Sequence, residues 1–120
     1  MQRDDRVYLL HMRDAAIMIA TYLAGIDAPT FHTTRLVQDG VIRQLEIIGE
    51  AAKQVTDRTR RRAPSIPWRS MAGMRDKLIH QYFGVDLDQV WLTATDDVPF
   101  LLDALLVLLA QWDQDVDRAT

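Results

Sequence analysis

Apolar positions recur at helical spacing along most of the chain. They do so between Asp4 and Ala24, and Gly25 then supplies a natural helix end. The clearest stripe steps by four, three, four and three residues, through Val41, Leu45, Ile48, Ala52 and Val55. This spacing predicts a long second helix that ends in an arginine-rich run. Two small residues in it, Gly49 and Ala52, let another helix approach closely.

A proline-containing break over residues 63–67 separates this helix from the next one. One stripe then holds Trp68, Met71, Arg75, Leu78 and Tyr82, which predicts a third helix ended by Gly84. Residues 86–89 resemble a capping box, so we expect a final helix from there through Trp112, with a kink at Pro99.

The sequence shows neither strand-like alternation nor an internal repeat, and the connections between the expected helices are short. We therefore predict an all-α fold, an antiparallel up-and-down four-helix bundle with one or two helices broken. At 120 residues the chain is long enough to bury a core, so residues 1–120 are expected to form a single domain.

The composition excludes every bond or site that depends on cysteine. With no cysteine, the chain has no disulfides, thiolate nucleophile or zinc–thiolate site, which suits a reducing cytosol. No apolar run resembling a signal peptide follows Met1, so a cytoplasmic location is expected. The most apolar stretch, residues 98–110, is too short to span a bilayer and contains Asp103.

The net charge of −3 conceals an uneven distribution. Residues 58–85 carry seven basic groups and one acidic group, whereas residues 86–120 carry one and eight. The basic segment could attract a phosphate backbone, and its cations are Arg58, Arg60, Arg61, Arg62, Arg69, Arg75 and Lys77. The alternative is a solvated helix end, where cations interact favourably with the helix dipole. Charge alone favours this alternative.

None of the three histidines has a second ligand placed for a closed metal site, and the chain lacks a phosphate-binding glycine loop and a nucleophile elbow. We therefore expect no metal and no cofactor. His11 and His32 are interpreted as surface or structural residues. His80 differs because Arg75, Asp76 and Tyr82 accompany it.

On a continuous helix, Asp76 would lie one turn before His80 and could orient its ring. His80 would be rotated away from Arg75, so a shared site needs a cleft edge or another subunit. Cleaving RNA without a metal requires a base, an acid and a cation at the phosphate, roles that histidine and arginine can fill. The alternative is a helix end where His80 meets the dipole, Arg75 pairs with a carboxylate and Tyr82 packs. Spacing alone favours this alternative.

The pattern Arg75-x4-His80-x-Tyr82 resembles the signature of HEPN-domain toxins of the HepT type. Further segments similar to that family cover residues 41 to 92, namely Ile48–Lys53, Ile66–Arg69, Gly73–Arg75, Tyr82–Asp86 and Val90–Trp91.

The resemblance implies a metal-independent endoribonuclease, the toxin of a type II toxin–antitoxin system, with Arg75 and His80 catalytic and Asp76 supporting. Arg69 and Lys77, in the same basic segment, are candidates for RNA binding. The resemblance further implies a homodimer whose two motif-bearing helices line a shared cleft. It also implies an MntA-like nucleotidyltransferase antitoxin that transfers AMP to Tyr82.

Two other hypotheses remain open. The chain could be a non-catalytic dimeric subunit that binds nucleotide or serves as an adaptor for a nucleotidyltransferase. It could also be a purely structural helical bundle.

Overall fold

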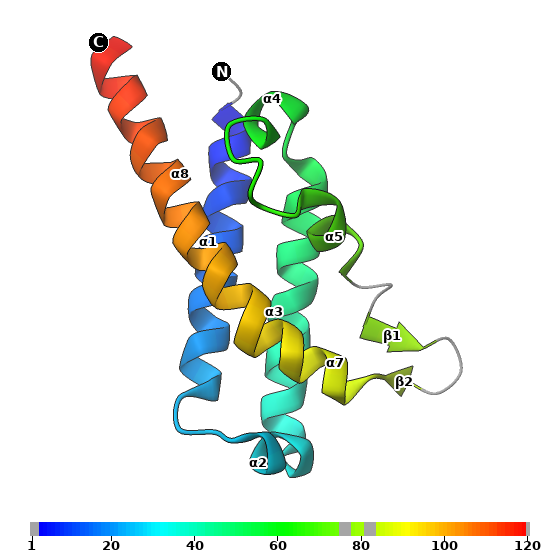
Figure 1. Cartoon of the computed structure of the whole chain (residues 1–120). Coiled ribbons are helices and arrows are strands. Elements are labelled where there is room, and N and C mark those ends of the chain that lie inside the picture. The colour runs from blue at the N-terminus through cyan, green and yellow to red at the C-terminus, as the bar shows by residue number, and fades with distance from the viewer. Residues whose placement is uncertain (1–2, 75–77, 81–83, 120) are drawn as a thin grey trace.

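Three long helices frame the fold, and shorter elements fill the space beside them (Figure 1). The computed structural model describes residues 3–74, 78–80 and 84–119. In chain order the elements are α1 (Arg3–Leu23), α2 (Ala28–Thr33), α3 (Arg35–Gln54), α4 (Asp57–Arg60), α5 (Trp68–Ala72), β1 (Ile79–His80), β2 (Gly84–Val85), α7 (Leu87–Leu92), the π-helical η1 (Thr93–Asp97) and α8 (Val98–Ala119).

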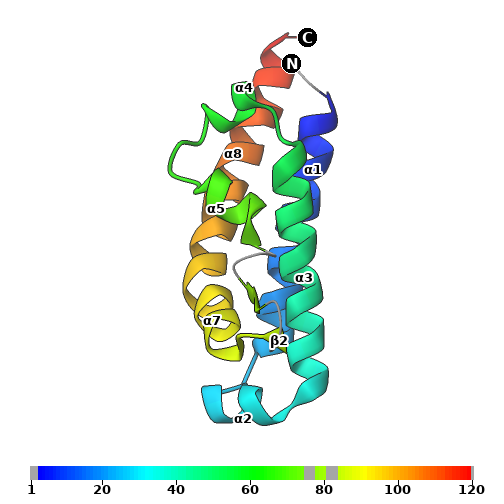
Figure 2. The ribbon, with the colours of Figure 1, turned by 90° about the vertical axis from the view of Figure 1, so that its right-hand side faces the viewer.

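The helices alternate in direction. In Figure 1, α1 descends, α3 ascends beside it, α5 descends, and the run from α7 through α8 ascends again. Turned by 90°, the molecule shows α1 and α3 in one layer and α5, α7 and α8 in the other (Figure 2). The predicted all-α, up-and-down bundle is confirmed, and its third helix is broken.

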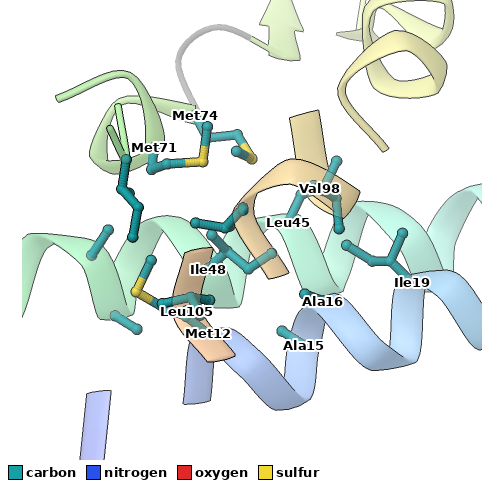
Figure 3. Close-up of a cluster of buried hydrophobic side chains, with 14 of the residues drawn as sticks. Met12, Ala15, Ala16, Ile19, Leu45, Ile48, Met71, Met74, Val98 and Leu105 are labelled. Carbon is teal, nitrogen blue, oxygen red and sulfur yellow. The ribbon is translucent and has the colours of Figure 1, made fainter. Parts of the chain in front are cut away.

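Apolar stripes of these helices meet in one cluster of buried side chains (Figure 3). Fully buried members include Met12 and Ile19 of α1, Leu45 and Ile48 of α3, and Leu101 and Leu105 of α8. Burial of each such side chain away from water stabilises the folded state by about 1.5–3 kcal/mol. No helix in the described ranges is long and apolar enough to cross a membrane.

The second helix is shorter than predicted. It ends at Gln54, and Val55 and Thr56 are extended before α4 begins at Asp57. The cause is the buried carboxylate of Asp5, which accepts hydrogen bonds from the Thr56 N–H at 3.2 Å and from the Thr56 and Thr59 hydroxyls at 2.6 Å each. The arginine-rich run therefore belongs to a separate turn, tied to the start of α1.

The third helix was also predicted wrongly as one element from Trp68 to Tyr82. Helix α5 ends at Ala72, with Gly73 as its C-cap, and residues 79 and 80 are in strand β1. That strand pairs with β2 in antiparallel register, Ile79 opposite Val85 and His80 opposite Gly84. Gly84 does break the helical pattern, but as a left-handed residue (φ 82°) in a strand pair.

The last helix was predicted to kink at Pro99, whereas the structure has a π-helical turn, Thr93–Asp97, just before that proline. The wide turn η1 precedes Pro99, and the Val98 N–H donates to the carbonyl of Thr93, five residues back. Because a proline donates no N–H and its ring crowds the preceding turn, a wider turn there relieves the conflict without ending the helix.

Candidate functional site

Buried side chains stand on both sides of residues 75–77, the first part of the motif segment Arg75–Tyr82. Met74 and Leu78 are 1% and 2% exposed, and they flank residues 75–77. Figure 3 shows Met71 and Met74 entering the cluster that contains Ile48 of α3. Of the predicted site residues, Arg75, Asp76, Lys77 and Tyr82 lie outside the described residues.

The backbone of His80 is placed by the strand pair. His80 lies opposite Gly84, so the chain enters and leaves residues 81–83 at paired positions. Because residues 79–80 form a strand, the helical-wheel relations that linked His80 to Asp76 and Arg75 no longer apply. The two catalytic candidates remain five residues apart in a segment anchored by α5 on one side and β2 on the other.

Helix α7 fixes the exit from this segment. The Asp86 N–H donates to the Leu78 carbonyl at 3.0 Å, and the Asp86 carboxylate accepts from the Gln89 N–H at 3.1 Å. The capping role predicted for Asp86 is confirmed. The strand pair and the start of α7 therefore form one hydrogen-bonded unit.

A histidine joins α7 to α2. His32 donates from Nδ1 to the Ala28 carbonyl, and its Nε2 lies against a carboxylate oxygen of Asp88, both at 2.7 Å. Beside it, the rings of Phe31 and Trp91 lie 5.3 Å apart. The bond to the Ala28 carbonyl, and then the bond to Asp88, raise the pKa of His32. The prediction of a structural histidine is confirmed.

The remaining candidates lie on the surface. Arg69 is exposed on α5, and His11 is exposed on α1. His11 lines a hollow of about 480 Å³ between α1 and α3, together with Tyr8, Arg43 and Glu50. Sequence periodicity gave no signal for this hollow, because its residues come from two helices far apart in the chain. Within the part of the chain that the structure describes, no group of three His, Cys, Asp or Glu side chains is arranged to hold a metal ion.

Comparison with known proteins identifies the family. The family model described as "Ribonuclease HepT-like" matches residues 12–108, a range that contains the whole Arg75–Tyr82 segment. The chain belongs to the HepT-like ribonuclease family. The recognition of a HEPN domain of the HepT type is thereby confirmed.

Relatives agree with this assignment. The chain is 45% identical to "Probable ribonuclease HepT" of Thermococcus cleftensis over 84% of its own length and 92% of the relative's. It is 37% identical to a protein of Methanocaldococcus jannaschii named "Gamma-glutamylcyclotransferase and putative RNase", over 96% of this chain. The chain spans about half of that protein, 52% of its length. No solved structure matches the chain.

Proposed function

We propose that this chain is an endoribonuclease that cleaves RNA without a metal ion, using Arg75 and His80. The observation that carries the proposal is the family match across residues 12–108, which includes both residues. Buried Met74 and Leu78 and the paired backbone of His80 support it, because they fix the chain just before Arg75 and around His80.

The chemistry proposed is attack of a ribose 2′-oxygen on the adjacent phosphorus. The P–O5′ bond breaks as the new P–O bond forms, leaving a 2′,3′-cyclic phosphate and a free 5′-hydroxyl. An imidazole can take the 2′-hydroxyl proton or protonate the leaving oxygen, since it titrates near neutral pH. We assign this role to His80, and to Arg75 the stabilisation of charge on the pentacoordinate phosphorus. Asp76 is a supporting residue, and Lys77 and Arg69 are assigned to RNA binding.

The proposed enzyme is the toxin of a type II toxin–antitoxin system in the cytoplasm. It acts as a homodimer in which two motif segments share one cleft. Its partner is an MntA-like nucleotidyltransferase that transfers AMP from ATP to the Tyr82 hydroxyl and releases pyrophosphate. A bulky anionic group on Tyr82 would occupy the phosphate site and exclude RNA.

Cleavage of labelled RNA in excess EDTA tests the enzymatic proposal. The purified chain should cut RNA, and Arg75→Ala or His80→Ala should lower the rate by at least about a hundredfold. Circular dichroism and sedimentation should show unchanged helicity and oligomeric state in both variants. Undiminished cleavage by both would refute the site assignment. Nucleotide or partner binding without any cleavage would favour the adaptor alternative.

Measurement of the intact mass of the protein tests the proposed transfer of AMP to Tyr82. Incubation with the nucleotidyltransferase and ATP should add one or more AMP groups to the chain, and Tyr82→Phe should abolish the addition. An unshifted mass, with a partner shown to be active on another substrate, would exclude this mode of control.

A further inference from the structure

The structure divides the arginines of the basic segment by what their guanidinium groups contact. Arg60 donates from Nε to the Val55 carbonyl at 3.0 Å and from Nη2 to the Ala52 carbonyl at 2.9 Å. Its Cζ also lies 6.0 Å from the centre of the Trp68 ring. Arg60 therefore closes the C-terminal end of α3 and holds α4 against α5, which is a structural role.

Arg62 is also engaged within the fold. Its Nη2 lies 2.6 Å from a carboxylate oxygen of Asp115, and its guanidinium stands over the Trp112 ring at 5.4 Å. Arg58 lines a hollow with Arg62 and Asp115, so it faces the acidic last turns of α8. The positive charge of Arg62 is therefore neutralised by Asp115, and Arg58 lines the same hollow as that carboxylate.

Arg61 and Arg69 differ from Arg60 and Arg62, and neither of them lines the hollow that contains Asp115. Both side chains are exposed, and within residues 3–74, 78–80 and 84–119 neither guanidinium forms an ion pair or a side-chain hydrogen bond. The Arg61 N–H donates to the carbonyl of Asp57, one turn before it, and this backbone bond does not engage the guanidinium. A guanidinium without a carboxylate partner keeps its full capacity for bidentate bonds to phosphate oxygens.

Arg61, the C-cap residue of α4, and Arg69 of α5 lie on neighbouring elements. Helix α4 and helix α5 both rest on the C-terminal half of α3, α4 through the Arg60 bond to Ala52 and α5 through Met71 against Gly49. Figure 1 shows α4 and α5 on the same part of the molecule, joined by residues 61–67. Arg69 is six residues before Arg75, so this surface leads along the chain into the motif segment.

We propose that Arg61 and Arg69 bind phosphates of a single-stranded RNA outside the phosphate that is cleaved. The surface formed by α4 and α5 thus extends the substrate path beyond Arg75 and His80, a statement that rests on the proposed function. Arg60 and Arg62 take no part in RNA binding. Phosphate contacts of this kind position a strand without selecting its sequence. Their loss should therefore weaken the binding of all single-stranded RNAs to the same extent.

The test measures RNA binding apart from cleavage. Full-length protein carrying His80→Ala is titrated with a fluorescent single-stranded oligoribonucleotide at several salt concentrations. Adding Arg61→Gln and Arg69→Gln together should weaken binding by about tenfold or more, and should reduce the slope of log K against log salt by about 1.4, since each phosphate contact on a single strand contributes about 0.7.

Arg43→Gln in the same background is the matched control. Arg43 is also exposed and without an ion pair among the described residues, but it lies between α1 and α3 beside His11. Its loss removes one positive charge, as each of the two substitutions in the double variant does, and should leave the slope unchanged. A slope unchanged in the double variant, or an equal loss in Arg43→Gln, would overturn the assignment of this surface.

The outcomes separate this inference from the proposed function. If the unsubstituted chain cuts no RNA but its binding of RNA depends on Arg61 and Arg69, the assignment of this surface is supported and the catalytic proposal is wrong. If the chain cuts RNA and the double variant has the parent's KM and salt slope, the catalytic proposal is supported and the assignment of this surface to RNA binding is wrong.

Discussion

At the scale of single residues, His32 shows how one side chain can fasten two elements. Both ring nitrogens lie 2.7 Å from acceptors, the Ala28 carbonyl and the Asp88 carboxylate. A neutral imidazole carries only one N–H, so the charged ring satisfies both acceptors and the neutral ring does not. The bond to Asp88 ties α2 to α7, the helix that follows the strand pair.

This arrangement predicts a pH dependence of stability. Because the pKa of His32 in the folded state is raised above its ordinary value of 6.5, the folded state binds the proton more tightly than the unfolded state. The stabilisation is complete below pH 6.5 and is lost as the pH rises through the folded-state pKa. The urea midpoint should therefore fall between about pH 6 and about pH 8 by more in the parent than in His32→Gln. Equal falls in both proteins would show that His32 does not contribute.

At the scale of the elements, the close approach of α5 to α3 sets where the motif segment begins. A Cβ added at Gly49 would stand 3.1 Å from the Met71 carbonyl oxygen and 3.7 Å from the Met74 Cβ. The expectation that Gly49 admits a neighbouring helix is confirmed, and that neighbour is α5. A backbone carbonyl cannot rotate away as a side chain can, so any larger residue there has to displace α5.

We therefore expect Gly49→Val to lower the free energy of unfolding by about 1–3 kcal/mol, and to reduce RNA cleavage in the folded protein by moving the segment that carries Arg75. Gly40→Ala is the control, since its added Cβ meets only the ring of Tyr22 at 3.2 Å, which can shift. Thermal melts and cleavage assays below the melting temperature measure both effects. Full activity of a folded Gly49→Val protein would mean that the position of α5 does not govern the site.

How far the sequence predicts these elements depends on the range of the contacts that define them. The long helices follow from local spacing, and the Asp86 cap from a local pattern. The break after α3 does not, because Asp5 reaches Thr56 across 51 residues of chain. The strand pair was not predicted either, because Leu78 continues the helical stripe of Trp68, Met71 and Arg75, although the next residue, Ile79, begins strand β1.

The candidate site was predicted less fully than the fold. The segment from Arg75 to Tyr82 was singled out by the sequence pattern alone and lies within the residues 12–108 that the family model matches. The structure places the backbone of His80 in strand β1. The geometry first assumed for the segment was wrong, because a continuous helix was extended through residues that form a strand. The roles of Arg75, Asp76, Lys77 and Tyr82 stay predictions.

At the scale of the whole molecule, the uneven charge of the chain is partly balanced by its own contacts. The acidic last turns of α8 face cations from earlier parts of the chain, Asp113 against Arg6 at 3.0 Å and Asp115 against Arg62 at 2.6 Å. The acidic segment therefore neutralises the cations nearest to it. The positive charge of Arg61 and Arg69, on α4 and α5, has no such partner among the described residues.

A homodimer with a shared cleft makes a prediction that a monomeric site does not. If each site takes Arg75 from one subunit and His80 from the other, a dimer of one Arg75→Ala chain and one His80→Ala chain contains one intact site. Mixing the two inactive proteins under conditions that exchange subunits should restore about a quarter of the parent activity, because about half of the dimers are then mixed. Mixed dimers that form but stay inactive would place both residues in the same subunit's site.

The contact between α1 and α8 also determines how this bundle can be joined to other proteins. Arg6 and Asp113 hold the first turns of α1 beside the late turns of α8, at the same end of the molecule in both views (Figures 1 and 2). The β1–β2 pair lies in the other half of the molecule in Figure 1. A tag, linker or additional domain attached at either end of the bundle would thus emerge away from the strand pair and leave it uncovered.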